Sequence, residues 1–176
     1  MNLNKILIAA VVAMGAMAPS AFAQVSDVQT FQVLVPSSIS ILAPTPLVTD
    51  THDGSDGDFA FLPQLWNVRG NVSTGVTVDF TVDGPFVHVT DNTQVRDAQL
   101  TVASPINVGA SAWSLASGSN SVATAGTGTT GTVTYSTTGP STGDFAVTVA
   151  FKGGTFGTFL AGVYETTVTG TVTQNP

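Results

Sequence analysis

The stretch Val76–Asp83 reads VTVDFTVD and carries the clearest structural pattern in this chain. Large apolar side chains alternate in it with threonine and aspartate, with a period of two residues. Successive side chains of a β-strand point to opposite faces, so this pattern indicates a strand with one buried and one solvated face. Threonine suits the outer face because it combines β-propensity with a polar group.

The same alternation recurs along the chain, in Phe145–Lys152 (FAVTVAFK), in Tyr164–Thr173 and at Phe31, Val33 and Val35. No helical stripe appears after the N-terminal segment. Turn residues such as Asp-Gly and Gly-Pro separate the strands, and many short strands at such spacing are typical of a sandwich or barrel. Weaker strands are expected at Ile39–Ala43, Phe59–Leu62, Leu65–Arg69, Gln99–Ala103, Trp113–Ala116, Val122–Ala125 and Thr132–Thr137.

These strands predict an all-β fold, an antiparallel β-sandwich. An outer-membrane barrel is the competing architecture, but its lipid-facing sides would be apolar, whereas the outer faces here carry threonine and aspartate. The low-complexity run Ser117–Thr130 is rich in Gly, Ser, Thr and Ala, and we expect it to form a long mobile hairpin loop.

Residues 1–23 have the pattern of a cleavable signal peptide. Lys5 gives a short positive region, Ile6–Ala18 is almost wholly small or apolar, and Ala21-Phe22-Ala23 supplies the small-x-small cleavage pattern. The apolar run is shorter than the ~20 residues that a spanning helix needs. We therefore expect a mature chain that begins at Gln24, without a membrane span, and forms a single domain over residues 24–176.

The charge balance excludes several classes of partner. The chain carries 11 acidic residues and four basic ones, and one of the basic residues is Lys5 of the signal. Arg69, Arg96 and Lys152 cannot supply the phosphate contacts that dominate nucleic-acid binding, and an anionic membrane surface is disfavoured for the same reason. There is no cysteine, which excludes disulfides, thiolate metal sites and cysteine nucleophiles.

One resemblance to a known family lies at the C-terminal end. The run Leu160–Thr173, LAGVYETTVTGTVT, resembles the closing strand of spore-coat-U-like and Csu-type pilin subunits and related secreted bacterial domains, which read Ala-Gly-x-Tyr before alternating Thr and Val. The likeness covers about 14 residues, and the cysteines usual in that family are absent here. It implies a secreted Ig-like sandwich and a role in a surface appendage or coat.

The densest polar cluster is Asp50–Asp58, DTHDGSDGD. Carboxylates between flexible glycines could wrap a hard cation, so the cluster is a candidate calcium site, although its spacing does not match an EF-hand loop. The ordinary alternative is a solvated turn between strands, and we favour it because Asp and Gly are common turn residues. The candidate ligands are Asp50, Asp53, Asp56 and Asp58.

No other motif indicates catalysis. His52 and His88 are far apart in sequence, no Gly-x-Ser-x-Gly elbow exists, and Asp79 and Asp83 share an outer strand face where solvent keeps both ionised. Trp66 and Trp113 are expected in the core; an exposed tryptophan would instead favour a glycan-binding surface.

The sequence therefore predicts a protein without a cofactor and with a non-catalytic, structural or adhesion-type role in the periplasm, at the cell surface or outside the cell. A carbohydrate-binding module and a secreted hydrolase are the alternatives.

The two ends of the mature chain suggest a mode of assembly. The segment after the cleavage site alternates apolar residues at Phe31, Val33 and Val35, and the C-terminal strand lacks lysine or proline that would protect its edge. We expect these strands to pair within one sandwich. The alternative hypothesis is that the N-terminal strand completes the sheet of a neighbouring copy and makes linear polymers.

Overall fold

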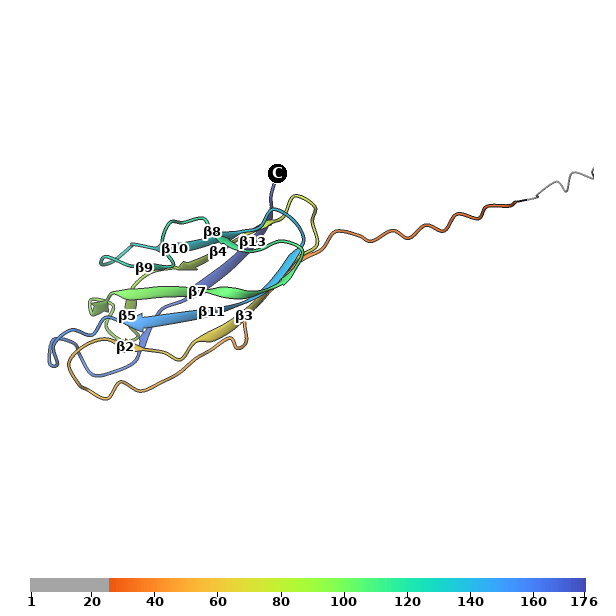
Figure 1. The fold of residues 1–176 in the computed structure, drawn as a ribbon. Helices are drawn as coiled ribbons and strands as arrows, with labels where there is room; N and C mark the ends of the chain where they lie inside the picture. The colour runs from red at the N-terminus through yellow and green to blue at the C-terminus, as the bar shows by residue number, and fades with distance from the viewer. Residues whose placement is uncertain (1–25) are drawn as a thin grey trace, which may run out of the picture. The chain divides into compact units, whose positions relative to one another are not determined.

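The structure is a computed structural model that describes residues 26–176 (Figure 1). The signal-peptide prediction for residues 1–23 lies outside the described residues. The chain divides into two units between Leu34 and Val35, and each is considered by itself. Residues 35–176 contain thirteen strands, and within the described residues there is no helix, which confirms the all-β prediction. No helix that could cross a membrane is found among residues 26–176.

The larger sheet has six strands in the order β1-β3-β11-β7-β9, with β2 paired to the end of β11. Every pairing in it is antiparallel. Its strands are β1 (Ile39–Leu42), β2 (Phe59–Ala60), β3 (Gln64–Gly70), β7 (Ala98–Gly109), β9 (Ser121–Ala123) and β11 (Ser141–Phe151).

A second sheet has the order β13-β4-β10-β8, and a small third sheet has the order β12-β5-β6. Figure 1 shows the two main sheets as two layers, which together form the expected sandwich. The strands of these sheets are β4 (Val76–Val82), β8 (Ser114–Leu115), β10 (Gly131–Ser136) and β13 (Val168–Gln174), and then β5 (Phe86–His88), β6 (Val95–Arg96) and β12 (Tyr164–Glu165).

The core is formed by the alternating positions of β4 and β11. Phe80 and Phe145 are fully buried, with ring centroids 5.2 Å apart, so the two sheets meet through these rings. Tyr135 of β10 adds a polar link, because its hydroxyl donates to the carbonyl oxygen of Val102 in β7 at 2.9 Å. The period-two pattern therefore identified the inward faces correctly.

The pairing of β7 with β11 contains one β-bulge. Asp144 faces Ile106, but Ala146 faces Ala103, so β7 has one extra residue in this interval. Pro105 lies within it and has no backbone N–H to donate to a ladder. Bulges are positions where a strand tolerates proline, which explains why the longest strand of the sheet can include one.

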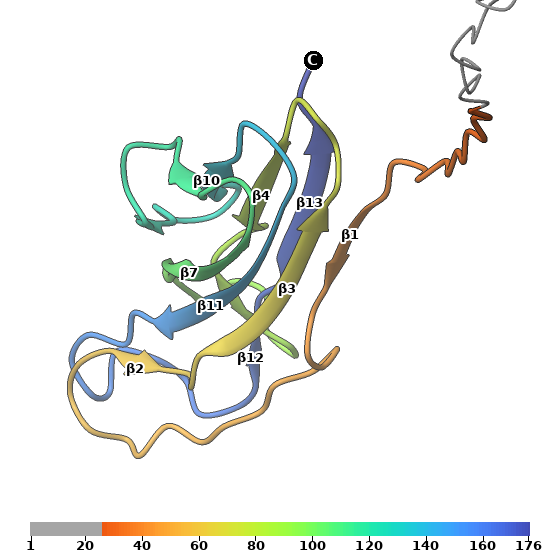
Figure 2. The same cartoon turned by 45° about the vertical axis from the view of Figure 1, so that its right-hand side comes forward.

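β1 and β13 are the end strands of the two main sheets, and they contact each other on one side of the sandwich (Figure 2). Ile41 of β1 and Trp66 of β3 pack directly over Gly170 of β13, where a Cβ would lie 2.6 Å from the nearest atom of each side chain. Each of the two strands has one hydrogen-bonded neighbour within the described part of the chain. This side of the sandwich therefore presents two unpaired edges.

The N-terminal expectation was wrong in one respect. Residues 26–38 carry no strand, and Phe31 and Val33 are 84% and 85% exposed. The first strand of the sandwich is β1, and β13 pairs with β4. The period-two pattern at Phe31–Val35 has the composition of a strand, but a strand also needs a partner ladder, and pattern alone does not provide one.

Candidate functional site

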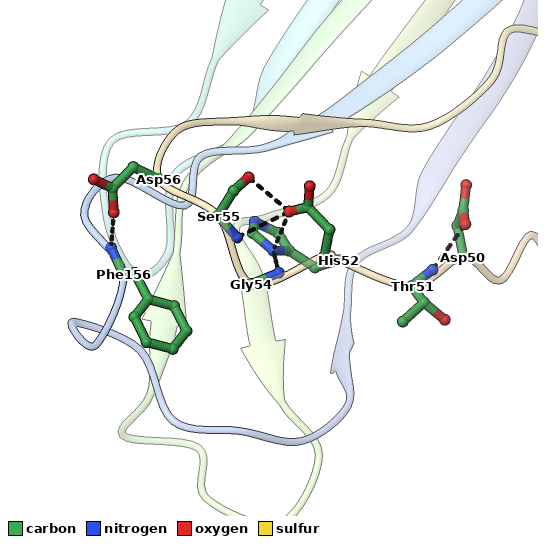
Figure 3. A network of polar contacts seen from close by, with 8 residues as sticks. Asp50, Thr51, His52, Gly54, Ser55, Asp56 and Phe156 are labelled. Atoms are coloured by element: carbon green, nitrogen blue, oxygen red, sulfur yellow. Dashed lines mark hydrogen bonds and ion pairs between the residues drawn. The ribbon is translucent and has the colours of Figure 1, made fainter.

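The acidic cluster lies in the long connection between β1 and β2. Asp50, Asp53, Asp56 and Asp58 all fall in this connection, and Figure 3 shows Asp50 and Asp56 on it. A second loop, residues 152–163 between β11 and β12, lies against it: the backbone N–H of Gly57 donates to the carbonyl oxygen of Gly154 at 2.7 Å. The two loops together form the candidate site.

Each carboxylate of the cluster has a separate partner in the protein. Asp53 accepts the backbone N–H and the hydroxyl of Ser55 at 2.9 and 2.6 Å, and these bonds hold the pKa of Asp53 below its ordinary value. Asp56 accepts the backbone N–H of Phe156 at 2.7 Å (Figure 3).

The remaining two carboxylates have other partners. Asp58 forms an ion pair with Lys152, and Asp50 accepts the N–H of its neighbour Thr51 at 2.8 Å. Among residues 26–176, no group of three or more histidine or acidic side chains is placed to hold a metal ion. The calcium hypothesis stays a prediction, and this geometry favours the alternative of a turn.

Thermal unfolding decides between these two interpretations. Because the four carboxylates already bind four different partners, we expect the same Tm in millimolar calcium and in excess chelator. A higher Tm in calcium that the Asp53→Asn variant abolishes would establish a calcium site instead.

An aromatic cavity lies beside the acidic cluster. Its volume is about 550 Å³, and its lining includes six of the ten phenylalanines together with His52 and Tyr164. A second cavity of about 440 Å³ adjoins it, and both are bordered by Leu47, Val48 and Glu165. The phenylalanines of the first cavity are Phe59, Phe61, Phe86, Phe151, Phe156 and Phe159.

The two histidines pack on this aromatic cluster and do not form a site with each other. The ring of His52 contacts the rings of Phe59 and Phe159, with centroids 5.6 and 5.4 Å away. His88 contacts the ring of Tyr164 at 4.9 Å.

His88 is buried and lies on the short strand β5, the central strand of the small sheet. Its Nδ1 accepts the backbone N–H groups of Thr90 and Asp91 at 3.3 and 3.1 Å. The proton therefore resides on Nε2, which donates to the carbonyl oxygen of Ala161 at 3.3 Å. Both ring nitrogens of His88 thus have structural partners that hold the β5 turn and the second loop together.

Trp113 lies in the core, as expected, whereas Trp66 packs against the core from its border. Trp113 is buried and donates from Nε1 to the carbonyl oxygen of Thr142 at 3.1 Å. Trp66 is half-buried, with its ring centroid 5.7 Å from that of Phe80. Neither indole is an exposed platform for stacking a sugar ring.

Asp79 of β4 and Asp83, which directly follows β4, have threonine hydroxyls as partners. Asp79 accepts the hydroxyl of Thr134 at 2.6 Å, and Asp83 accepts the hydroxyl of Thr169 at 2.8 Å. These are cross-strand contacts to threonines, and neither carboxylate faces a histidine.

Sequence reasoning missed the aromatic cavity. Phe156 and Phe159 lie in a glycine-rich loop, GGTFGTFL at residues 153–160, where period-two analysis has nothing to detect. The signal that could have found them is the presence of two large aromatic rings in a segment whose glycines predict a surface loop.

Comparison of the chain with protein-family models and with curated proteins finds no match.

Proposed function

We propose that this chain is a non-catalytic structural subunit of a secreted or cell-surface assembly, in which copies associate by strand addition. One observation carries the proposal: a chain with two unpaired sheet edges also has an extended apolar segment that no strand ladder covers. The N-terminal segment of one copy would add to the open side of the next.

The donor segment is residues 28–35. Its apolar side chains Val28, Phe31, Val33, Leu34 and Val35 are each at least 72% exposed. Soluble proteins rarely leave so many large apolar side chains in a short stretch facing water without a partner. Apolar side chains at every second position, Phe31, Val33 and Val35, are the arrangement that an added strand uses to fill pockets on an acceptor sheet.

The acceptor is the side of the sandwich bounded by β1 and β13. The second cavity, of about 440 Å³, is lined by the segment that directly follows β1 and by Val168 at the start of β13, and it reaches the core residue Val147. Native proteins protect sheet edges with charges, proline or covering segments. The edge strand β13 carries no charged residue and no proline between Val168 and Gln174.

The resemblance of Leu160–Thr173 to pilin-like subunits favours a structural role. Secretion, with a final location in the periplasm, at the cell surface or outside the cell, is part of the same proposal. Glycan binding and hydrolysis remain alternatives, but no contact described above favours either.

Sedimentation of the purified secreted protein over a concentration series tests the proposal. We expect oligomers that grow with concentration and disappear when residues 24–35 are deleted. The double variant Phe31→Ser with Val33→Ser should also abolish them, because polar side chains lose the hydrophobic gain of filling the acceptor side. Hydrogen exchange should show β13 amides more protected in the oligomer than in the monomer.

The matched control is the double variant Thr30→Ser with Gln32→Ser, which changes the intervening positions of the same segment and should keep the oligomers. A protein that stays monomeric at its highest soluble concentration contradicts the proposal. So does an oligomer that survives deletion of the segment.

A further inference from the structure

We propose that the aromatic cavity beside the acidic cluster binds an organic cation, of the quaternary or alkyl-substituted ammonium class. This inference does not depend on the assembly proposed above, because the cavity lies at the loops and the donor segment is not part of it.

The size and lining of the cavity fit a small molecule. Its volume of about 550 Å³ lies within the range of roughly 300–1,000 Å³ that is typical of ligand sites. Its rings are not all sealed in the core: Phe59, Phe61, Phe159 and Tyr164 are half-buried, and Phe156 is 64% exposed. Several rings can therefore turn a face or an edge toward a ligand.

The charge of the lining selects the sign of the ligand. Asp50 and Glu165 border the cavity, and within the described residues no lysine or arginine does. The carboxylate of Glu165 is exposed and makes no hydrogen bond or ion pair within residues 26–176, so it is free to face a ligand. An anionic ligand would meet the two lining carboxylates, whereas the guanidinium that lies against a lining ring, that of Arg96, faces Phe159 and does not itself line the cavity.

Aromatic rings add a second attraction for a cation. The face of a phenyl or phenol ring carries partial negative charge, and cages of such rings are a known way of binding ammonium groups. One ring of this cluster already interacts in this way: the guanidinium carbon of Arg96 lies 5.8 Å from the ring centroid of Phe159. Aromatic faces and carboxylates together favour an ammonium group that carries alkyl substituents over a hydrated metal ion or an anion.

Calorimetric titration with a pair of isosteric probes tests the charge requirement. Choline carries a quaternary ammonium, and 3,3-dimethylbutan-1-ol has the same shape with a neutral carbon in place of the nitrogen. We expect choline to bind the purified secreted protein at one site, and the neutral alcohol to bind at least about tenfold more weakly. Equal affinity for both compounds, or no heat with choline at any soluble concentration, overturns the proposal.

Two variants locate the site. Glu165→Gln removes a charge from an exposed side chain, and Phe156→Leu removes a ring from the loop; both should weaken choline binding several-fold and leave the Tm nearly unchanged. Asp144→Asn is the matched control, because it removes an exposed carboxylate that does not border the cavity, and it should bind choline as the parent does. Choline binding that neither cavity variant weakens would place the cation elsewhere and overturn the assignment.

Discussion

The Phe80→Ala variant should lower the free energy of unfolding by about 3–5 kcal/mol, the cost usual for removing a large aromatic side chain from a packed core. Phe80 is fully buried, and its ring contacts Trp66 from one strand and Phe145 from another. Both partners belong to the opposite sheet, so the cavity would open between the two layers, where β4 and β11 cannot easily close it.

Chemical denaturation of the purified protein measures this loss in the free energy of unfolding. In thermal unfolding, the Tm should fall by about 10 °C. Thr171→Ala is the control, because Thr171 is exposed on the neighbouring strand β13 and the change should stay within about 0.5 kcal/mol. A Phe80→Ala protein that unfolds at the parent denaturant concentration would show that the two sheets do not share this core.

The β-sandwich could be predicted because the residue pattern that indicates each strand is local in the sequence. In β4, every second residue is buried, and the alternation of Val and Phe with Thr and Asp is visible in the sequence. The same holds for Phe145 and Val147 in β11. A period-two pattern specifies which face turns inward and so identifies strands, but it does not specify which strands become neighbours, because pairing depends on loops and on long-range packing.

The candidate site could not be predicted, for the opposite reason. The cavity is made where loops from distant parts of the chain meet: His52 contacts Phe159, and Asp56 binds the backbone of Phe156, 100 residues away. Neither loop has a periodic pattern. The aspartates were visible in the sequence and suggested calcium, but their separate backbone and hydroxyl partners depend on turn geometry that composition does not reveal.

The N-terminal segment shows a third case. Phe31, Val33 and Val35 have the pattern of a strand and yet carry no strand within the described residues. The alternation of apolar and polar residues indicates which side chains the segment would bury if it paired with a sheet. Because β1 and β13 have unpaired edges, the partner sheet in the proposed assembly belongs to a second copy of the chain. The segment that was expected to pair within its own sandwich is therefore the proposed donor strand.

The Gly75→Ala variant should destabilise the protein by roughly 3–5 kcal/mol, through backbone conformation and overlap together. Gly75 precedes β4 with φ of 83°, a region that residues with a Cβ rarely adopt. A Cβ at this position would also overlap the carbonyl group of Thr137 and lie 2.8 Å from the backbone nitrogen of Gly139. Because these are main-chain atoms, they cannot move aside as a flexible side chain could. Gly75 is also held in place, since its carbonyl oxygen accepts the N–H of Asn175 at 3.0 Å.

Gly118→Ala separates the two causes. Gly118 has nearly the same φ, 78°, but nothing lies within 4 Å of a Cβ there, so this variant measures the conformational cost alone, about 1 kcal/mol. Denaturant unfolding of the two variants should therefore differ by at least about 2 kcal/mol, and that difference is the cost of the overlap with the turn after β10. Equal losses in the two variants would mean that the chain around Thr137 relaxes freely, which is incompatible with the buried hydrogen bond of 3.0 Å that the Thr137 hydroxyl accepts from the backbone N–H of Val76.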